Sequence, residues 1–322
     1  MKEASRLKGY SYSHDIGRKA RDNGQILSVR VETSLLCNMR CRYCGWNSGI
    51  PLDDEVGFDT LINFISEAKE MGAKSVVIIG GGEPTIYTHF KELVTYINQE
   101  DLIPVVITNG LTTDIELAKF LFENNCSVLI KCDSFKAEVQ DYLSGMDGAY
   151  KKIQYGLKSL IEAGFTKSVS DDNNLRLGIS FVVTSKNIDE VCDIWRFCRM
   201  NNIYPNIELL NPTGRSLENI DELLPDSKKL ANIMKTISEI DEKEFQIKQI
   251  KQIDRSNHCL QHLYSVYLNV AGYVQPCGAI RIRNFNYKDN SLRTILNNDY
   301  FKKARSKEIH LDENVELTSF NV

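Results

Sequence analysis

Six short runs of β-branched and aliphatic residues alternate with amphipathic stretches, and this alternation limits the fold more than any other feature. The expected strands lie at 28–33, 75–80, 103–108, 127–133, 177–184 and 206–210. Between them, apolar residues recur at helical spacing at 61–69, 114–124, 148–163 and 187–201. Strands that alternate with helices pair in parallel, because each helix returns the chain to the start of the next strand. We predict an α/β fold, a partial (β/α)6 barrel of parallel strands with helices outside.

Composition excludes several classes of protein. A chain of 322 residues with 42% hydrophobic residues can build one large domain and a small one. A formal charge of -4 offers no footprint for nucleic acid or an anionic membrane surface. No apolar run approaches the roughly 20 residues of a membrane span, and the first 25 residues lack a signal-peptide core. We expect a cytoplasmic protein with reduced cysteines that binds neither nucleic acid nor membrane.

Three cysteines follow the first expected strand directly. Cys37, Cys41 and Cys44 are separated by three and two residues. Three thiolates can hold three irons of a 4Fe-4S cube and leave the fourth iron open to a ligand. A zinc site lacking its fourth ligand, or buried free thiols, are the alternatives for this spacing.

The next two expected strands end in residues that suit a ligand site. Residues 76–84 read Val-Val-Ile-Ile-Gly-Gly-Gly-Glu-Pro, and residues 105–110 read Val-Val-Ile-Thr-Asn-Gly. Glycines at a strand end let a ligand approach the backbone, whose carbonyls accept bonds from an ammonium group, although an ordinary tight turn has the same composition. Ligands of parallel sheets bind at the carboxyl ends of strands. The cysteines and both glycine turns are expected at that edge.

In this order, the cysteine triad, Gly81-Gly82-Glu83-Pro84 and Thr108-Asn109-Gly110 resemble the radical S-adenosylmethionine (SAM) superfamily. The resemblance implies a 4Fe-4S cluster on Cys37, Cys41 and Cys44, with SAM as the second cofactor. It also implies an electron from a flavodoxin or ferredoxin. Reductive cleavage of SAM would then give a 5′-deoxyadenosyl radical that takes a hydrogen atom from a strong C–H bond.

The same resemblance assigns residues that contact SAM. Tyr43 would pack near the adenine, and the backbone from Gly81 to Glu83 would receive the methionine amino group. Pro84 stiffens that turn without removing a needed donor. Asn109 joins this expected cofactor-binding set.

The fourth expected strand departs from the family pattern. Relatives often resemble Ser-x-Asp-Gly here, whereas this chain has Lys131-Cys132-Asp133-Ser134. Lys131 and Asp133 share a strand face. Lys131 either neutralises a carboxylate such as Asp133, or binds substrate or moves a proton, and we count it as a catalytic candidate. Asp133, Ser134 and Ser180 are candidates for holding the methionine carboxylate or the ribose.

The sixth expected strand leads into further candidates. Leu209 or Leu210 would wall the adenine, and we assign Leu210 to the cofactor site. Glu208 and Arg215 are charged groups near the expected site and become catalytic candidates. An arginine near a site usually pairs with a carboxylate or phosphate, and surface exposure is the alternative for Arg215.

The expected domain plan has four parts. Residues 1–27 form an N-terminal extension and residues 28–216 the barrel. Residues 217–257 are rich in Lys and Glu and are expected to form a connecting helical segment. Residues 258–322 form a small C-terminal α+β extension.

This tail resembles the opening half of a SPASM or twitch domain, which in relatives carries an auxiliary iron–sulfur cluster. Cys259 and Cys277 match that pattern around Gly272, but the Cys-x-x-Cys that completes such a cluster is missing downstream. Three accounts are open: non-cysteine ligands or substrate complete the cluster, the twitch fold has lost its cluster, or the chain is cut short. We favour no intact auxiliary cluster. His258 and His262 flank Cys259 as candidate ligands or as capping and core groups.

Charged residues near the expected site bear on the class of substrate. Only 27 residues precede the first strand, too few for a leader-binding domain, and Lys131, Glu208 and Arg215 suit a small polar or phosphorylated ligand. We expect oxidation or epimerisation of a small hydroxylated substrate such as a sugar, a cyclitol or a nucleotide-linked molecule. The alternatives are modification of a ribosomally made peptide and, in another class, a non-catalytic iron–sulfur or zinc protein.

Overall fold

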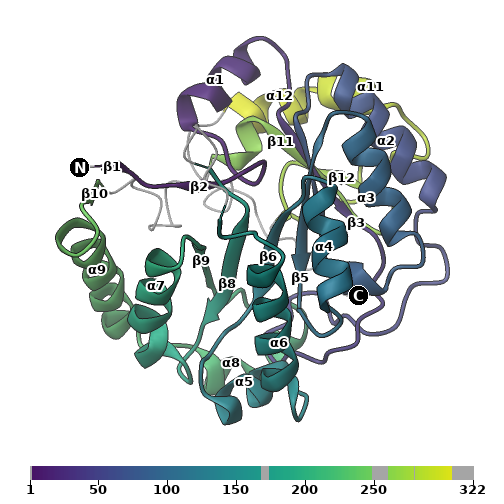
Figure 1. The fold of residues 1–322 in the computed structure, drawn as a ribbon. Helices are drawn as coiled ribbons and strands as arrows, with labels where there is room; N and C mark the ends of the chain where they lie inside the picture. The colour runs from purple at the N-terminus through teal and green to yellow at the C-terminus, as the bar shows by residue number, and fades with distance from the viewer. Residues whose placement is uncertain (1, 168–173, 249–259, 279, 307–322) are drawn as a thin grey trace.

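A curved parallel sheet forms the centre of the protein (Figure 1), in a computed structural model that describes residues 2–167, 174–248, 260–278 and 280–306. Six parallel strands lie side by side in chain order. They are β3 (Ser28–Glu32), β4 (Ser75–Ile79), β5 (Ile103–Thr108), β6 (Ser127–Lys131), β8 (Leu177–Val183) and β9 (Tyr204–Leu209). The predicted partial barrel is confirmed, with β9 beginning two residues before the expected 206.

Helices cover the outer side of this sheet (Figure 1). They are α2 (Phe58–Glu70), α3 (Phe90–Gln99), α4 (Ile115–Glu123), α6 (Ala149–Glu162) and α7 (Val191–Met200). Alternate strand residues such as Val76 and Ile78 face the helices in one buried core. Asp114 caps α4 by accepting a 2.8 Å hydrogen bond from the Leu117 amide. Within the described ranges, no helix is long and apolar enough to cross a bilayer.

The inward face of the sheet changes from apolar to polar along the strands. Near their amino ends, Leu7 and Tyr10 pack against Val77, Val105 and Leu129. The N-terminal segment that supplies them contains β1 (Lys2–Glu3), β2 (Arg6–Leu7) and α1 (His14–Asp22). Strand β1 pairs with β10 (Ile247–Lys248), and β2 pairs with β7 (Asn174–Leu175). The segment therefore fills the amino end of the barrel and leaves the carboxyl end for a site.

The segment after β9 is mostly helical. It contains a 3-10 helix at Gly214–Asn219, α8 (Ile220–Leu223) and α9 (Ser227–Lys243). Helix α9 packs against α7. A helical connecting segment was expected here, and α9 occupies the middle of it.

The C-terminal segment continues the barrel sheet. Strand β11 (Ser265–Leu268) pairs in parallel with β3, and β12 (Val274–Gln275) pairs antiparallel with β11. Helices α11 (Leu292–Asn297) and α12 (Asp299–Ser306) follow, and α11 packs on α2. The small α+β extension is present, although its direct pairing with β3 makes the sheet continuous. The domain boundaries drawn from the sequence stay predictions.

Candidate active site

All three cysteines of the triad line one cavity at the carboxyl ends of the strands. Its volume is about 220 Å³, and Cys37, Cys41 and Cys44 all contribute to its wall. The loop that carries them, residues 33–57, runs from β3 to α2. It is held to the end of β4 because the Gly82 amide donates to the Ser34 carbonyl at 2.7 Å and the Glu83 amide to the Leu36 carbonyl at 2.9 Å. Two adjacent strand ends therefore place the thiols.

The donor set fits an iron–sulfur cube better than a single metal ion. Burial raises the pKa of the Cys41 thiol to about 12 and also raises the pKa of Cys37, so a metal that binds these sulfurs as thiolates displaces their protons. Among the described residues, no three His, Cys, Asp or Glu side chains gather closely enough to share one metal ion. A cube takes each thiolate on a different iron, so three separated thiols suit it. The residues present fit a 4Fe-4S cluster.

The glycines after β4 serve the packing of the cysteine loop. Gly81 adopts a positive φ of 48°, and a Cβ at Gly82 would overlap the carbonyl oxygen of Leu36. The Ser48 hydroxyl donates to the Gly81 carbonyl. Gly81 and Gly82 also line the cavity. Their expected contact with the methionine amino group stays a prediction, and the structure supplies a second reason for glycine here.

Glu83 joins the ends of β4 and β5. Its carboxylate accepts hydrogen bonds from the Thr108 hydroxyl at 2.6 Å and the Asn109 amide at 2.7 Å. Burial raises the pKa of this carboxyl group, and the hydrogen bonds oppose that rise. Asn109 in turn donates to the side-chain oxygen of Asn38 in the cysteine loop at 2.7 Å. Pro84 begins a 3-10 helix, Pro84–Ile86, and is not part of the cavity wall.

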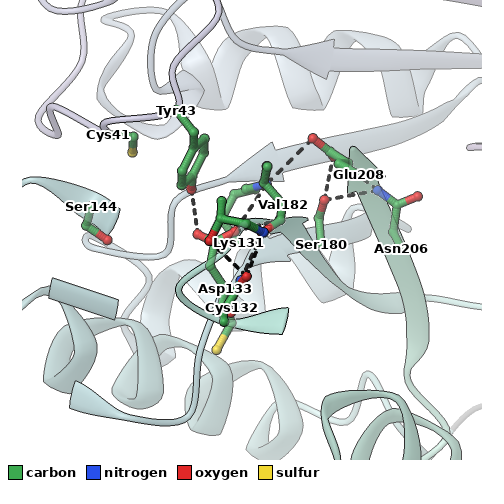
Figure 2. A network of polar contacts seen from close by, with 12 residues as sticks. Cys41, Tyr43, Lys131, Cys132, Asp133, Ser144, Ser180, Val182, Asn206 and Glu208 are labelled. Atoms are coloured by element: carbon green, nitrogen blue, oxygen red, sulfur yellow. Dashed lines mark hydrogen bonds and ion pairs between the residues drawn. The ribbon is translucent and has the colours of Figure 1, made fainter. Parts of the chain in front are cut away.

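A polar network crosses the cavity between the cysteine loop and strands β6, β8 and β9 (Figure 2). The Tyr43 hydroxyl donates to Oδ2 of Asp133 at 2.5 Å, and the Val182 amide donates to Oδ1 at 2.8 Å. Nζ of Lys131 lies 3.8 Å from Oδ1 of Asp133 and 3.6 Å from Oε2 of Glu208. It also lies 5.4 Å from the centroid of the Tyr43 ring. Lys131 therefore has two carboxylates and an aromatic face around it, and all four side chains line the cavity.

Glu208 is the more accessible carboxylate of this network. Its side chain is 31% exposed, whereas that of Asp133 is 0% exposed. Oε1 of Glu208 accepts from the Ser180 hydroxyl at 2.5 Å and from the Asn206 amide group at 3.1 Å. Of the two carboxylates, Glu208 is therefore the one a ligand can reach.

Besides Pro84, three predicted cofactor contacts lie away from the cavity wall. Ser134 is fully buried, and its hydroxyl donates to the Glu190 carboxylate at 2.8 Å, because the chain has turned outward after β6. Ser180 is also fully buried and reaches the cavity only through Glu208. Leu209, the last residue of β9, lines the cavity, whereas Leu210 follows the strand and is not part of the cavity wall.

Arg215 braces the cysteine loop. Its guanidinium donates to the Cys41 carbonyl at 3.0 Å and to the Ser48 carbonyl at 2.9 Å. It lines the cavity and is half-buried, so the surface alternative does not hold. Two of its donors are committed to the backbone, which favours a positioning role over the catalytic one expected.

Cys277, the tail cysteine that the structure describes, does not line this cavity. The half-buried Cys277 packs against Ile280 and Ala304 and is not part of the cavity wall. Cys259 and His258 lie outside the described residues. His262 is buried in a short 3-10 helix, Gln261–Leu263, with 3% of its surface exposed. An auxiliary cluster stays a prediction for testing.

Among the residues to which the sequence analysis gave no role, Glu32 and Trp46 matter most for the geometry of this region. Trp46 lines the cavity two positions after Cys44, and its indole nitrogen donates to Glu32 at 2.6 Å. The alternation of side chains along β3 could have indicated Glu32. Glu32 shares the inward face of this strand with Arg30, and it is the last residue before the loop that carries the cysteines. No pattern signalled Trp46.

Comparisons with known proteins agree with this geometry. The model of the radical SAM superfamily matches residues 31–197. The mycofactocin maturase MftC of Mycolicibacterium smegmatis is 31% identical over 193 residues, which cover 60% of this chain and 46% of that protein. The AdoMet-dependent heme synthase of Methanosarcina barkeri is 24% identical over 309 residues, 87% of this chain and 85% of that protein.

A solved structure shows the same fold. SuiB of Streptococcus suis, bound to the precursor peptide SuiA, matches with a TM-score of 0.69 at 16% identity, over 88% of this chain and 67% of SuiB. The match to the maturase MftC spans about half of that protein's length. Because the family model covers more than half of the chain, the chain belongs to the radical SAM superfamily. It is a radical SAM enzyme, and its family uses a 4Fe-4S cluster and SAM, as the resemblance implied.

Proposed function

We propose that the substrate of this radical SAM enzyme is a ribosomally made peptide, from which the enzyme takes a hydrogen atom at a side-chain or backbone carbon. The main observation behind this proposal is that one cavity is lined by three thiols and by the ion pair of Lys131 and Glu208. This proposal reverses the preference for a small hydroxylated substrate that the sequence suggested. Flavodoxin or ferredoxin stays the proposed reductant.

The charges of the site favour a peptide over a phosphorylated small molecule. Lys131 and Arg215 are the cations that line the cavity. Lys131 lies between two carboxylates, and two donors of Arg215 are bound to backbone carbonyls. A phosphate entering the cavity would be repelled by the two carboxylates beside Lys131 and would compete with the backbone carbonyls for Arg215.

The loop that carries the cysteines, residues 33–57, exposes apolar side chains. Four large ones are exposed, namely Leu36 at 39%, Trp46 at 37%, Ile50 at 80% and Leu52 at 44%, and Trp46 also lines the cavity. Exposed apolar side chains can mark a contact with a partner, and a peptide is large enough to cover several of them. MftC, a maturase, and SuiB, solved with a precursor peptide, support the same reading.

The chain's own residues position the reacting groups and exclude water. When bound, the cluster and SAM supply a 5′-deoxyadenosyl radical. Ile79, Ile107 and Val182 line the inner cavity and keep it dry. Lys131 and Glu208 offer a charged donor and acceptor to the substrate, and Lys131 can move a proton at the carbon-centred radical or its product.

Deuterium transfer tests the peptide assignment. The reconstituted enzyme is incubated anaerobically with SAM, a reductant and deuterated candidate peptides encoded near its gene, in parallel with deuterated sugars and cyclitols. We expect deuterium in 5′-deoxyadenosine only with a peptide. Transfer from a sugar or cyclitol would contradict the proposal, and the match to the heme synthase makes a tetrapyrrole the next substrate to include.

A further inference from the structure

A single carboxylate joins the C-terminal hairpin to the cysteine loop. Glu32 ends β3 and is 2% exposed. It accepts hydrogen bonds from the Trp46 indole nitrogen at 2.6 Å, the Tyr267 hydroxyl at 2.6 Å and the Val270 amide at 2.9 Å. The first donor belongs to the cysteine loop, and the other two belong to the hairpin of β11 and β12, which lies beside β3 (Figure 1).

The C-terminal segment holds Trp46 at a second point. The guanidinium of Arg281 lies 5.5 Å from the centroid of the Trp46 ring and donates to the carbonyl of the neighbouring Gly45 at 2.5 Å. Trp46 lines the cavity and is 37% exposed. Residues more than 200 positions away in the sequence therefore fix an aromatic ring at the cavity.

The chemistry of Glu32 makes this arrangement specific. A buried carboxylate is unfavourable unless its oxygens accept hydrogen bonds, and here three donors supply them. A glutamine could accept only on one atom, so its amino group would face either the Val270 amide or the Trp46 and Tyr267 donors. The site therefore discriminates between two side chains of nearly equal size.

We infer that Glu32 is a positioning residue that holds the Trp46 indole as a wall of the active-site cavity, so that the C-terminal hairpin shapes the space the substrate enters. The inference takes from the proposed function only that this cavity is the active site. It does not depend on whether the substrate is a peptide. The test uses no substrate, so a result against the peptide assignment leaves this inference untouched, and a result against this inference leaves the peptide assignment untouched.

Fluorine NMR reports on the indole directly. The chain has two tryptophans, Trp46 and Trp195, so protein labelled with 5-fluorotryptophan gives two signals, which Trp46→Phe assigns. Trp195 is 5% exposed and donates to Asp241 at 2.7 Å, so it reports on folding. In the holoenzyme with an oxidised cluster, we expect Glu32→Gln to shift and broaden the Trp46 signal and to leave the Trp195 signal in place.

Glu67→Gln is the matched control. Glu67 also receives a tyrosine hydroxyl and a backbone amide from the C-terminal segment, from Tyr287 and Leu292, both at 2.8 Å, but it does not line the cavity. We expect the Trp46 signal of Glu67→Gln to match that of the wild type. An equal change in both variants would show general loosening of the tail and would overturn the inference.

Two further measurements test the contact between Glu32 and Trp46. S-adenosylhomocysteine, the probe used to fill the cavity, should move the Trp46 signal of the wild type, and the absence of any response would show that Trp46 is not a cavity wall. If Glu32→Gln does not fold, Tyr267→Phe removes one donor only and should change the Trp46 signal in the same direction to a smaller extent. If the Trp46 signal stays at its wild-type position in each of these variants that folds, Glu32 does not position Trp46.

Discussion

The hydroxyl of Tyr43 donates a 2.5 Å hydrogen bond to Asp133 and so ties the cysteine loop to the end of β6. The other oxygen of Asp133 accepts from the Val182 amide at 2.8 Å. Both oxygens of this fully buried carboxylate are therefore hydrogen-bonded without Lys131. Lys131, whose ammonium lies closer to Glu208 than to Asp133, is not the only partner that Asp133 has.

Lys131→Met tests whether this ammonium acts on the substrate. We expect iron content and folding to persist, because Asp133 keeps its two donors, and product formed per 5′-deoxyadenosine to fall by about 10² to 10⁴, the range for a positioned acid–base group. Single-turnover product yield and melting temperature measure the two effects. Lys136→Met is the control, because Lys136 is a largely exposed lysine whose ammonium lies 4.0 Å from Glu190. A lower melting temperature with full product yield would make Lys131 a structural counter-charge.

Arg215→Lys tests the brace on the cysteine loop. One ammonium cannot reproduce the planar fork that reaches the carbonyls of both Cys41 and Ser48. We expect iron to be lost faster to a chelator, with a destabilisation of about 1 to 3 kcal/mol. Arg196→Lys, at a surface pair with Glu244, should lose iron at the wild-type rate. Wild-type iron retention in Arg215→Lys would show that the brace does not support the cluster.

Gly82→Ala tests the packing of the glycine turn against the cysteine loop. The added methyl group would overlap the Leu36 carbonyl, so the loop must shift. We expect little or no cluster after anaerobic reconstitution, read from the iron and sulfide content per chain. Gly57→Ala is the control, because a Cβ there meets nothing within 4 Å. Equal cluster content in the two variants would refute the packing argument.

The two tail cysteines test for an auxiliary cluster. Without one, reconstituted protein should hold about four irons per chain, and the double variant Cys259→Ala, Cys277→Ala should hold the same. Iron and sulfide analysis of both proteins is the measurement. About eight irons per chain, falling to about four in the double variant, would show that other ligands complete a second cluster.

The sequence predicted the barrel because strand composition and helical spacing alternate without interruption from β3 to β9. It predicted the place of the cysteines, Glu83 and Asn109, because motifs at the ends of parallel strands share one edge of the sheet. It did not predict which oxygens accept hydrogen bonds. Ser134 donates to Glu190, and Arg215 donates to backbone carbonyls. These contacts depend on the paths of loops, which the sequence pattern does not predict.

The choice between Leu209 and Leu210 depended on where β9 ends. The strand ends at Leu209, which lines the cavity, and the two leucines are chemically alike, so the sequence does not distinguish them. Glu32 and Trp46 depend on a hairpin that returns to β3 from more than 200 residues away. A contact of that range has no local signal in the sequence.

The most direct test of the central claim measures 5′-deoxyadenosine from a triple variant, Cys37→Ala, Cys41→Ala, Cys44→Ala, after anaerobic reconstitution with iron and sulfide. Wild-type protein given SAM and dithionite should form 5′-deoxyadenosine and methionine. The triple variant should form neither, because no other described thiol lines the cavity. Reductive cleavage of SAM by the triple variant would show that this cavity does not hold the cluster and would contradict the account.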